Sequence, residues 1–213
     1  VALRANPDGH TLFMNSSAIA VNVSLYAKPG YAMKDITPIL QGPTTPNLIT
    51  VHPSVKAKTL QELIALAKTT PLSYGSSGTG TTPHLDMELL FKSLAKVDIT
   101  HVPYNPAAAA TGTWLATTAV GSTSMPPAVP HVKSGRLRGM AMTSAKRSRA
   151  APEIPTVAEQ GFPGYQASLW YQMMAPANTP EAIVKRLNTE INRVLKTPDF
   201  IEQLAVQGAE PLF

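Results

Sequence analysis

Short apolar runs that are typical of strands alternate with helical segments along most of the chain. The strand-like runs are 11–15, 36–41, 47–52, 72–75, 98–104, 117–124, 137–144 and 165–176. Thr59 and Glu62 have the spacing of a capping box, which begins an amphipathic helix between two of these runs. Because strands and helices alternate, the sequence predicts an α/β fold with a mainly parallel sheet.

Proline and capping signals place the other helices. Further helices are expected at 83–96, 106–116 and 125–135, and two more begin at Thr179-Pro180 and Thr197-Pro198. A second capping box, Thr156 with Glu159, begins a turn that Gly161 ends. No internal repeat or low-complexity linker interrupts this order.

The chain has 213 residues, which suffices for one large domain or two small lobes. It has no cysteine, so disulfides, thiolate catalysis and cysteine-ligated zinc are excluded. The net charge of +5 comes from basic residues that are spread out, and the small group at 146–149 is typical of a solvated face. We therefore expect no nucleic-acid partner. No apolar run reaches the ~18 residues of a membrane span, and no signal peptide is recognisable.

The stretch GSSGTGTTPH, residues 75–84, matches three nucleotide or catalytic motifs poorly. Gly75 and Gly80 have the spacing of a P-loop, but Thr81 stands where that motif needs lysine. A dinucleotide fingerprint would need glycine or alanine where Pro83 lies, and the serines lack the spacing of a nucleophile elbow. We therefore expect no cofactor and no metal at this loop.

Three interpretations of this loop remain open. A strand–loop–helix junction can aim backbone N–H groups and hydroxyls at one point, where a carboxylate binds without lysine or arginine. The same residues could instead form a satisfied structural turn with Thr81 or Thr82 as an ordinary N-cap. An enzyme that uses Ser76 or Ser77 is a third possibility, but the sequence places no His–Asp/Glu pair beside either serine.

An ordered series of segments along the chain resembles one family. The segments are PDGHTLFMNSS, SYGSSGTGTTPHLDMELL, HVPY, PHVKSGRLRGMAMTSAKRS, PEIPTVAEQGFPGYQASLWYQMMAPANTP and GAEP. Together they resemble the Bug/TctC-type extracytoplasmic solute-binding receptors of tripartite tricarboxylate transporters. The resemblance implies a two-lobed, periplasmic-binding-protein-like (type II) fold that closes by a hinge on a small organic carboxylate, without doing chemistry. It also implies a periplasmic location and delivery of the ligand to the membrane subunits of a transporter.

The resemblance also implies where the lobes divide and which residues bind the ligand. One lobe is expected from 1–47 plus 171–213, and the other from 48–170. The expected ligand-binding residues are Ser16, Ser17, Ser77, Gly78, Thr79, Gly80, Thr81, Tyr104 and Thr123, with His101 a weaker candidate.

The sequence departs from the family pattern in two ways. A first strand, loop and helix that the family carries are not recognisable, nor is a final helix after GAEP, so we expect a fold truncated at both ends. That expectation adds a non-binding remnant as an alternative, and it predicts open strand edges through which a second copy could pair. Thr123 takes the place of a common acidic residue, which suggests a ligand without an ammonium group.

Overall fold

The computed structural model describes residues 2–105, 108, 112–113 and 115–212. They form two compact units, Val1–Thr44 with Leu169–Phe213 (unit 1) and Thr45–Ser168 (unit 2). The lobe boundaries that the resemblance implies, after residues 47 and 170, stay a prediction.

Unit 1 is built on a three-stranded sheet with the strand order β1-β8-β2. Its strands are β1 (Phe13–Ser16), β2 (Ile36–Thr45) and β8 (Leu169–Pro176), and β1 runs antiparallel to β8. Its helices are η1 (Ala2–Arg4), α1 (Ala18–Leu25), η2 (Met33–Asp35), α6 (Glu181–Leu195) and α7 (Pro198–Val206). The two helices predicted at the C-terminal end are thus confirmed, whereas α1 was not predicted.

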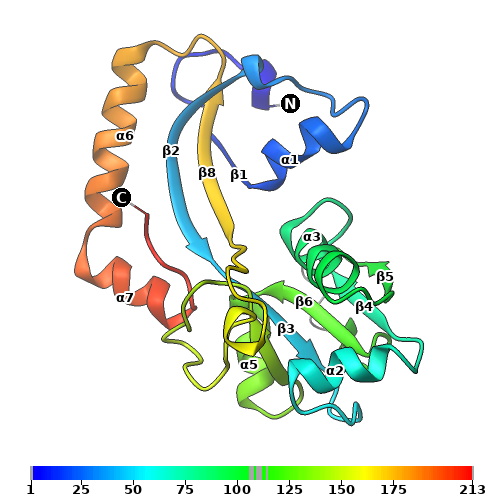
Figure 1. The fold of residues 1–213 in the computed structure, drawn as a ribbon. Coiled ribbons are helices and arrows are strands. Elements are labelled where there is room, and N and C mark those ends of the chain that lie inside the picture. The colour runs from blue at the N-terminus through cyan, green and yellow to red at the C-terminus, as the bar shows by residue number, and fades with distance from the viewer. Residues whose placement is uncertain (1, 106–107, 109–111, 114, 213) are drawn as a thin grey trace. The chain divides into compact units, whose positions relative to one another are not determined.

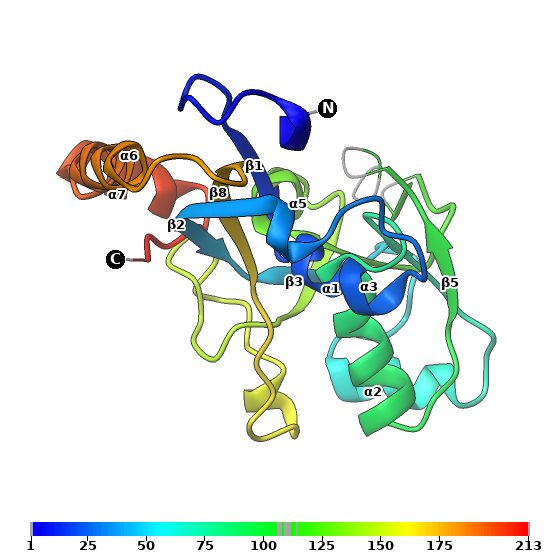
Figure 2. The same ribbon diagram turned by 90° about the horizontal axis from the view of Figure 1, so that it is seen from above.

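Helices cover both faces of the unit 1 sheet, as Figures 1 and 2 show for α6 and α1. On one face, Ile39 and Ala175 of the strands form a buried cluster with Leu195 of α6. On the other face, Met174 packs with Ile19 of α1. Neighbouring residues of a strand point to opposite faces, so Met174 and Ala175 serve the two clusters separately.

Unit 2 contains a five-stranded sheet with the strand order β5-β4-β6-β3-β7. The strands are β3 (Asn47–Val51), β4 (Ser73–Ser76), β5 (Thr100–Pro103), β6 (Val120–Ser124) and β7 (Arg138–Met142). The prediction of a mainly parallel sheet needs correction, because β3 runs antiparallel to both β6 and β7. The other four strands share one direction, and β3, which follows directly on β2, runs opposite to them.

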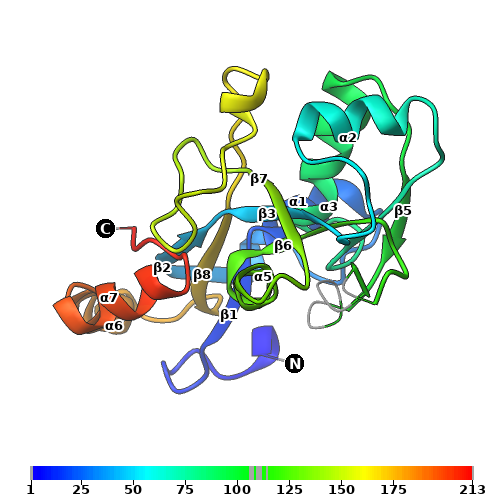
Figure 3. The ribbon, with the colours of Figure 1, turned by 90° about the horizontal axis from the view of Figure 1, so that it is seen from below.

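Helices cover both faces of the unit 2 sheet as well (Figure 3). They are α2 (Leu60–Ala67), α3 (Thr82–Met87), which continues as the π-helix η3 (Glu88–Leu94), α5 (Met125–Lys133) and the single turn η4 (Ala158–Gln160). The larger core joins Ile49 and Val120 of the sheet to Leu63 of α2 and Phe91 of η3. A smaller core lies under α5 and includes Leu48.

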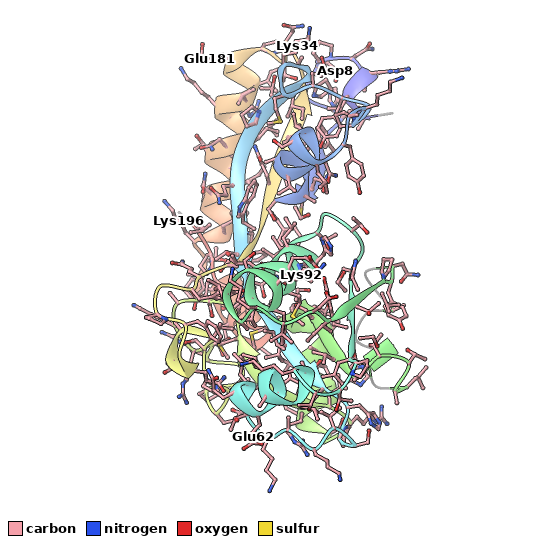
Figure 4. The ribbon with its side chains drawn as sticks, turned by 45° about the vertical axis from the view of Figure 1, so that its right-hand side comes forward. Asp8, Lys34, Glu62, Lys92, Glu181 and Lys196 are labelled. Carbon is pink, nitrogen blue, oxygen red and sulfur yellow. The ribbon has the colours of Figure 1, made fainter. Side chains whose placement is uncertain are left out.

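The predicted capping residues start two helices of unit 2. The Thr59 hydroxyl accepts from the Glu62 N–H at 3.2 Å, and Glu62 lies in the first turn of α2 (Figure 4). Thr156 and Glu159 bond each other's backbone N–H, which makes the second capping box complete. The helix predicted at 106–116 lies mostly outside the described residues. Of the helices that are described, none has the length and apolar character needed to cross a bilayer.

Candidate functional site

The Gly-rich stretch forms the strand–loop–helix junction that the sequence predicts. β4 ends at Ser76, and α3 begins at Thr82. Between them, Gly78 and Gly80 have φ angles of 112° and 80°, which glycine adopts without a steric penalty. The Thr81 hydroxyl donates to the Gly78 carbonyl at 2.7 Å and closes the loop on itself.

Several N–H groups of this loop are already used inside it. The Gly78 N–H donates to the Ser76 hydroxyl at 3.2 Å, and the Gly80 N–H donates to His84 Nδ1 at 3.3 Å. The Thr81 N–H donates to the Gly78 carbonyl. These bonds belong to the structural-turn interpretation, because donors that are satisfied within the loop have less to offer a ligand.

Other donors at the junction remain open. In the described part of the chain, neither the N–H nor the hydroxyl of Ser77 has a hydrogen-bond partner. The Thr82 hydroxyl is buried and also unpartnered among these residues. Sequence reasoning did not select Thr82 as a binding residue, although its place as the first residue of a helix could have suggested it. Ser77 and Thr82 are therefore the groups of this junction that are best able to meet an anion.

Two histidines form hydrogen bonds with residues of this junction. His101 Nε2 lies 2.8 Å from the Ser76 hydroxyl, and the His101 ring stacks on Tyr74 with 4.9 Å between ring centroids. The His84 ring lies 4.3 Å from that of His101. Burial lowers the pKa of both histidines, and for His101 the neighbouring His84 lowers it further. Both rings are therefore neutral at pH 7 and act as hydrogen-bonding supports.

The contact between Ser76 and His101 bears on the enzyme alternative. Sequence reasoning found no base beside Ser76, because His101 is 25 residues away and reaches it through the parallel pairing of β4 with β5. However, Ser76 is completely buried, and its hydroxyl also contacts the Gly78 carbonyl. In the described residues no carboxylate bonds His101, so this pair lacks the third group of a triad. The geometry supports a loop anchor and not a nucleophile.

Tyr104, a predicted ligand contact, packs against the strand that leads into the loop. A Cβ atom added to Gly75 would lie 3.0 Å from the Tyr104 ring, and one added to Gly112 would lie 2.6 Å from it. The Tyr104 hydroxyl also lies 2.7 Å from that of Thr117. The ring therefore occupies space that the two glycines leave open. Contact between Tyr104 and a ligand stays a prediction.

The two serines predicted in unit 1 lie where β1 passes into α1. Ser16 is the last residue of β1, and Ser17 precedes the first helical residue. The Ser17 N–H donates to the Trp170 carbonyl at 2.9 Å, which ties the junction to β8. The Ser17 hydroxyl is buried without a partner among the described residues. This junction thus also carries an open polar group, in keeping with its predicted binding role.

Thr123 lies in β6 with only 2% of its surface exposed, directly opposite Leu48. We expect Thr123→Asp to weaken carboxylate binding, as the sequence predicts, and also to lower the free energy of unfolding by roughly 3 kcal/mol, because it buries a carboxyl group. Thermal unfolding measures this loss of stability, with Thr123→Val, whose side chain has the same shape as threonine, as the control. An unchanged midpoint for the aspartate variant would show that the site is more open than the structure has it.

Comparisons with known proteins give a consistent result. A profile of the tripartite tricarboxylate transporter family receptors (TctC) matches residues 1–213. Protein BugT of Bordetella pertussis is 34% identical over 211 residues, which cover 96% of this chain and 64% of BugT. A UPF0065 protein of Pseudomonas sp. strain P51 is 32% identical over 96% of this chain and 62% of its own length. The chain thus spans a little under two thirds of these relatives.

Solved structures agree with the sequence comparison. The R. palustris protein Rpa4515, solved with adipate, superposes with a TM-score of 0.93 at 33% identity, over 99% of this chain and 72% of its own. MatC from Rhodopseudomonas palustris, solved with bound malate, gives a TM-score of 0.87 at 28% identity, over 98% and 72%. The periplasmic binding protein BugD gives a TM-score of 0.90 at 27% identity, over 99% and 72%. The match confirms the α/β, periplasmic-binding-protein-like fold.

Proposed function

Because this chain belongs to the tripartite tricarboxylate transporter receptor family, we propose that it binds a small organic carboxylate through the loop at 77–82. The observation that carries the proposal is the set of open donors on Ser77 and Thr82 at the end of β4. An N–H or hydroxyl that donates to a carboxylate contributes about 1.5–3 kcal/mol. No charged side chain occurs in residues 75–82, so such a site relies on neutral donors.

The ligand class is inferred from two similar proteins. Rpa4515 was solved with adipate and MatC with malate, and both ligands are dicarboxylates. A loop of neutral hydrogen-bond donors recognises a carboxylate group but does not specify the rest of the ligand. We therefore propose a mono- or dicarboxylate without an ammonium group, as the threonine at position 123 suggests.

The setting of the proposed receptor follows from the family. The family is one of receptors and not of enzymes, and similar solved structures are periplasmic binding proteins. We propose that this protein works in the periplasm and passes its ligand to the membrane subunits of a transporter. Closure of a hinge on the ligand, and pairing of two copies through open strand edges, both stay predictions.

A thermal-shift panel tests the proposed function. The chain is heated with adipate, malate, citrate, benzoate and several amino acids, and adipamide serves as an uncharged control. A ligand at 100 times its Kd should raise the midpoint by about 5–10 °C, because it binds only the folded state. A response to adipamide as large as that to adipate would contradict carboxylate recognition. A flat panel would contradict the proposed function.

A further inference from the structure

A buried carboxyl group lies one helical turn after the Gly-rich loop. Asp86 of α3 has 4% of its surface exposed. Its Oδ2 atom accepts a hydrogen bond of 2.5 Å from the side-chain amide of Asn47, which is completely buried at the start of β3. The Tyr165 hydroxyl donates to the Asp86 backbone carbonyl at 3.0 Å. Within the described residues no cation pairs with Asp86, so its carboxyl group has little to stabilise a negative charge.

An unpartnered acceptor lies on the same amide. Asn47 Oδ1 is buried and has no hydrogen-bond partner in the described part of the chain. An amide oxygen only accepts hydrogen bonds, so satisfying it requires a donor. Asn47 already uses its amide nitrogen on Asp86, and an ionised carboxylate has no proton to return. The missing donor is therefore what a protonated Asp86 would supply.

We propose that Asp86 carries a proton in the native protein and donates it to Asn47 Oδ1. The two side chains then form a cyclic acid–amide pair. Asn47 Nδ2–H donates to one carboxyl oxygen, and the hydroxyl of the other carboxyl oxygen donates to Asn47 Oδ1. The proton comes from solvent as the chain folds. The pair fixes α3, and with it the loop at 77–82, against β3, which makes Asp86 a positioning residue for the site in the proposed function.

The electrostatic surroundings agree with a neutral Asp86. Burial raises the pKa of Asp86 to about 7, against a smaller lowering by the bond from Asn47. The phenol of Tyr165, which lies shortly before the end of unit 2, is a titratable group in contact with Asp86. Its pKa is raised mainly by burial. On its own helix, His84 bonds the loop and Glu88 bonds Tyr74 and Lys92. Lys92 is the cation among these groups, and it pairs with Glu88 and not with Asp86.

The pair also reaches both segments by which the chain enters and leaves unit 2. The Asn47 N–H donates to the Thr143 hydroxyl at 2.9 Å, and the Thr143 N–H donates to the Asn47 carbonyl at 3.0 Å. In the segment by which the chain leaves unit 2, the Ala167 N–H donates to the Thr143 carbonyl at 2.8 Å. Tyr165 of the same segment holds the Asp86 backbone. Loss of the proton from Asp86 would therefore weaken the link between α3 and β3, while the bond from Tyr165 to the Asp86 backbone would remain.

The test compares thermal unfolding of the wild-type chain and Asp86→Asn between pH 5 and pH 8. The folded chain holds the proton on Asp86 more tightly than the unfolded chain, whose pKa is 3.8. This stabilisation is complete below pH 3.8 and is lost as pH rises to about 7. The amide of the variant keeps both bonds at every pH. The midpoint of the variant relative to wild type should therefore rise by roughly 5–10 °C across this range.

Controls and a second readout decide the outcome. The other titratable groups are common to both proteins and cancel in the difference. Asp98→Asn, at an exposed position of the same unit, should show no such trend. If the difference in midpoint between Asp86→Asn and wild type does not change with pH, Asp86 does not carry the proposed proton. In wild type alone, the infrared band of a protonated carboxyl should be present at pH 6 and fade by pH 8. If this band is absent at pH 6, the proposed acid–amide pair is contradicted by the wild-type protein alone.

Amide hydrogen exchange tests the positioning role. After correction for intrinsic rates, exchange at 77–81 in wild type should be several-fold faster at pH 8 than at pH 6, and Asp86→Asn should abolish this difference. If the midpoints shift as expected but exchange in the loop does not, the pair stabilises unit 2 without positioning the loop, and that part of the proposal fails. None of these measurements uses a ligand, so their failure is distinct from failure of the proposed function.

Discussion

Replacing Gly78 with valine is expected to weaken carboxylate binding by at least about tenfold, a change of about 1.4 kcal/mol. Gly78 has a φ angle of 112°, and a β-branched residue there is strained by roughly 1–3 kcal/mol. A shift of Gly78 that relieves the strain would disturb the bond from its N–H to Ser76 and the bond from the Thr81 hydroxyl to its carbonyl. Ser77 lies between these anchors, so its open donors would move. Calorimetric titration with the carboxylate that the panel identifies measures the loss.

The matched control for this variant is Gly135→Val. Gly135 also has a positive φ, 72°, and a Cβ atom there would meet nothing within 4 Å. It lies after α5 in the same unit and outside the loop, so the variant should also carry backbone strain and still bind. Binding that is lost equally in both variants would point to general destabilisation. Unchanged binding by Gly78→Val would show that the loop does not hold the ligand.

Truncating Phe91 to alanine is expected to lower the free energy of unfolding of unit 2 by about 3–5 kcal/mol. Phe91 of η3 is 1% exposed and packs in the larger core with residues of α2 and the sheet. The truncation leaves a cavity where these elements meet, and the surrounding core can close it only in part. Denaturant unfolding followed by circular dichroism measures the loss.

Leu89→Ala is the control for Phe91→Ala, because Leu89 lies on the same helix but is 43% exposed. Its truncation should change stability by no more than about 0.5 kcal/mol. Hydrogen exchange should show the loss for Phe91→Ala in the strands of unit 2 and leave α6 unaffected, because α6 packs in a separate cluster. Equal losses for the two variants would contradict the core that the structure describes.

Much of the fold could be predicted because local sequence patterns determine many of its helices and strands. The apolar residues of α6 recur at helical spacing, and Leu187, Ile191 and Leu195 do face one cluster. In contrast, α1 was missed because the apolar residues of its sequence, AIAVNVSL, show no helical spacing. The direction of β3 was also missed, since it depends on how the chain enters unit 2 and not on the composition of the strand.

The candidate site was predicted less completely. The junction at 76–82 follows from glycine, hydroxyl residues and Pro83, and the structure confirms it. The position of His101 beside Ser76 depends on the register of β4 with β5, and the pairing of Asn47 with Asp86 joins residues 39 positions apart. Such contacts leave no local spacing in the sequence, so pattern reasoning could not find them.

The most direct test of carboxylate binding at this loop is a titration followed by the backbone amide signals of the isotope-labelled chain. With adipate, or another carboxylate that raises the unfolding midpoint, we predict saturable shifts centred on the amides of Ser77 and Thr82, and none with adipamide. Saturable binding that leaves both amides unchanged, or equal shifts with adipamide, would contradict the account.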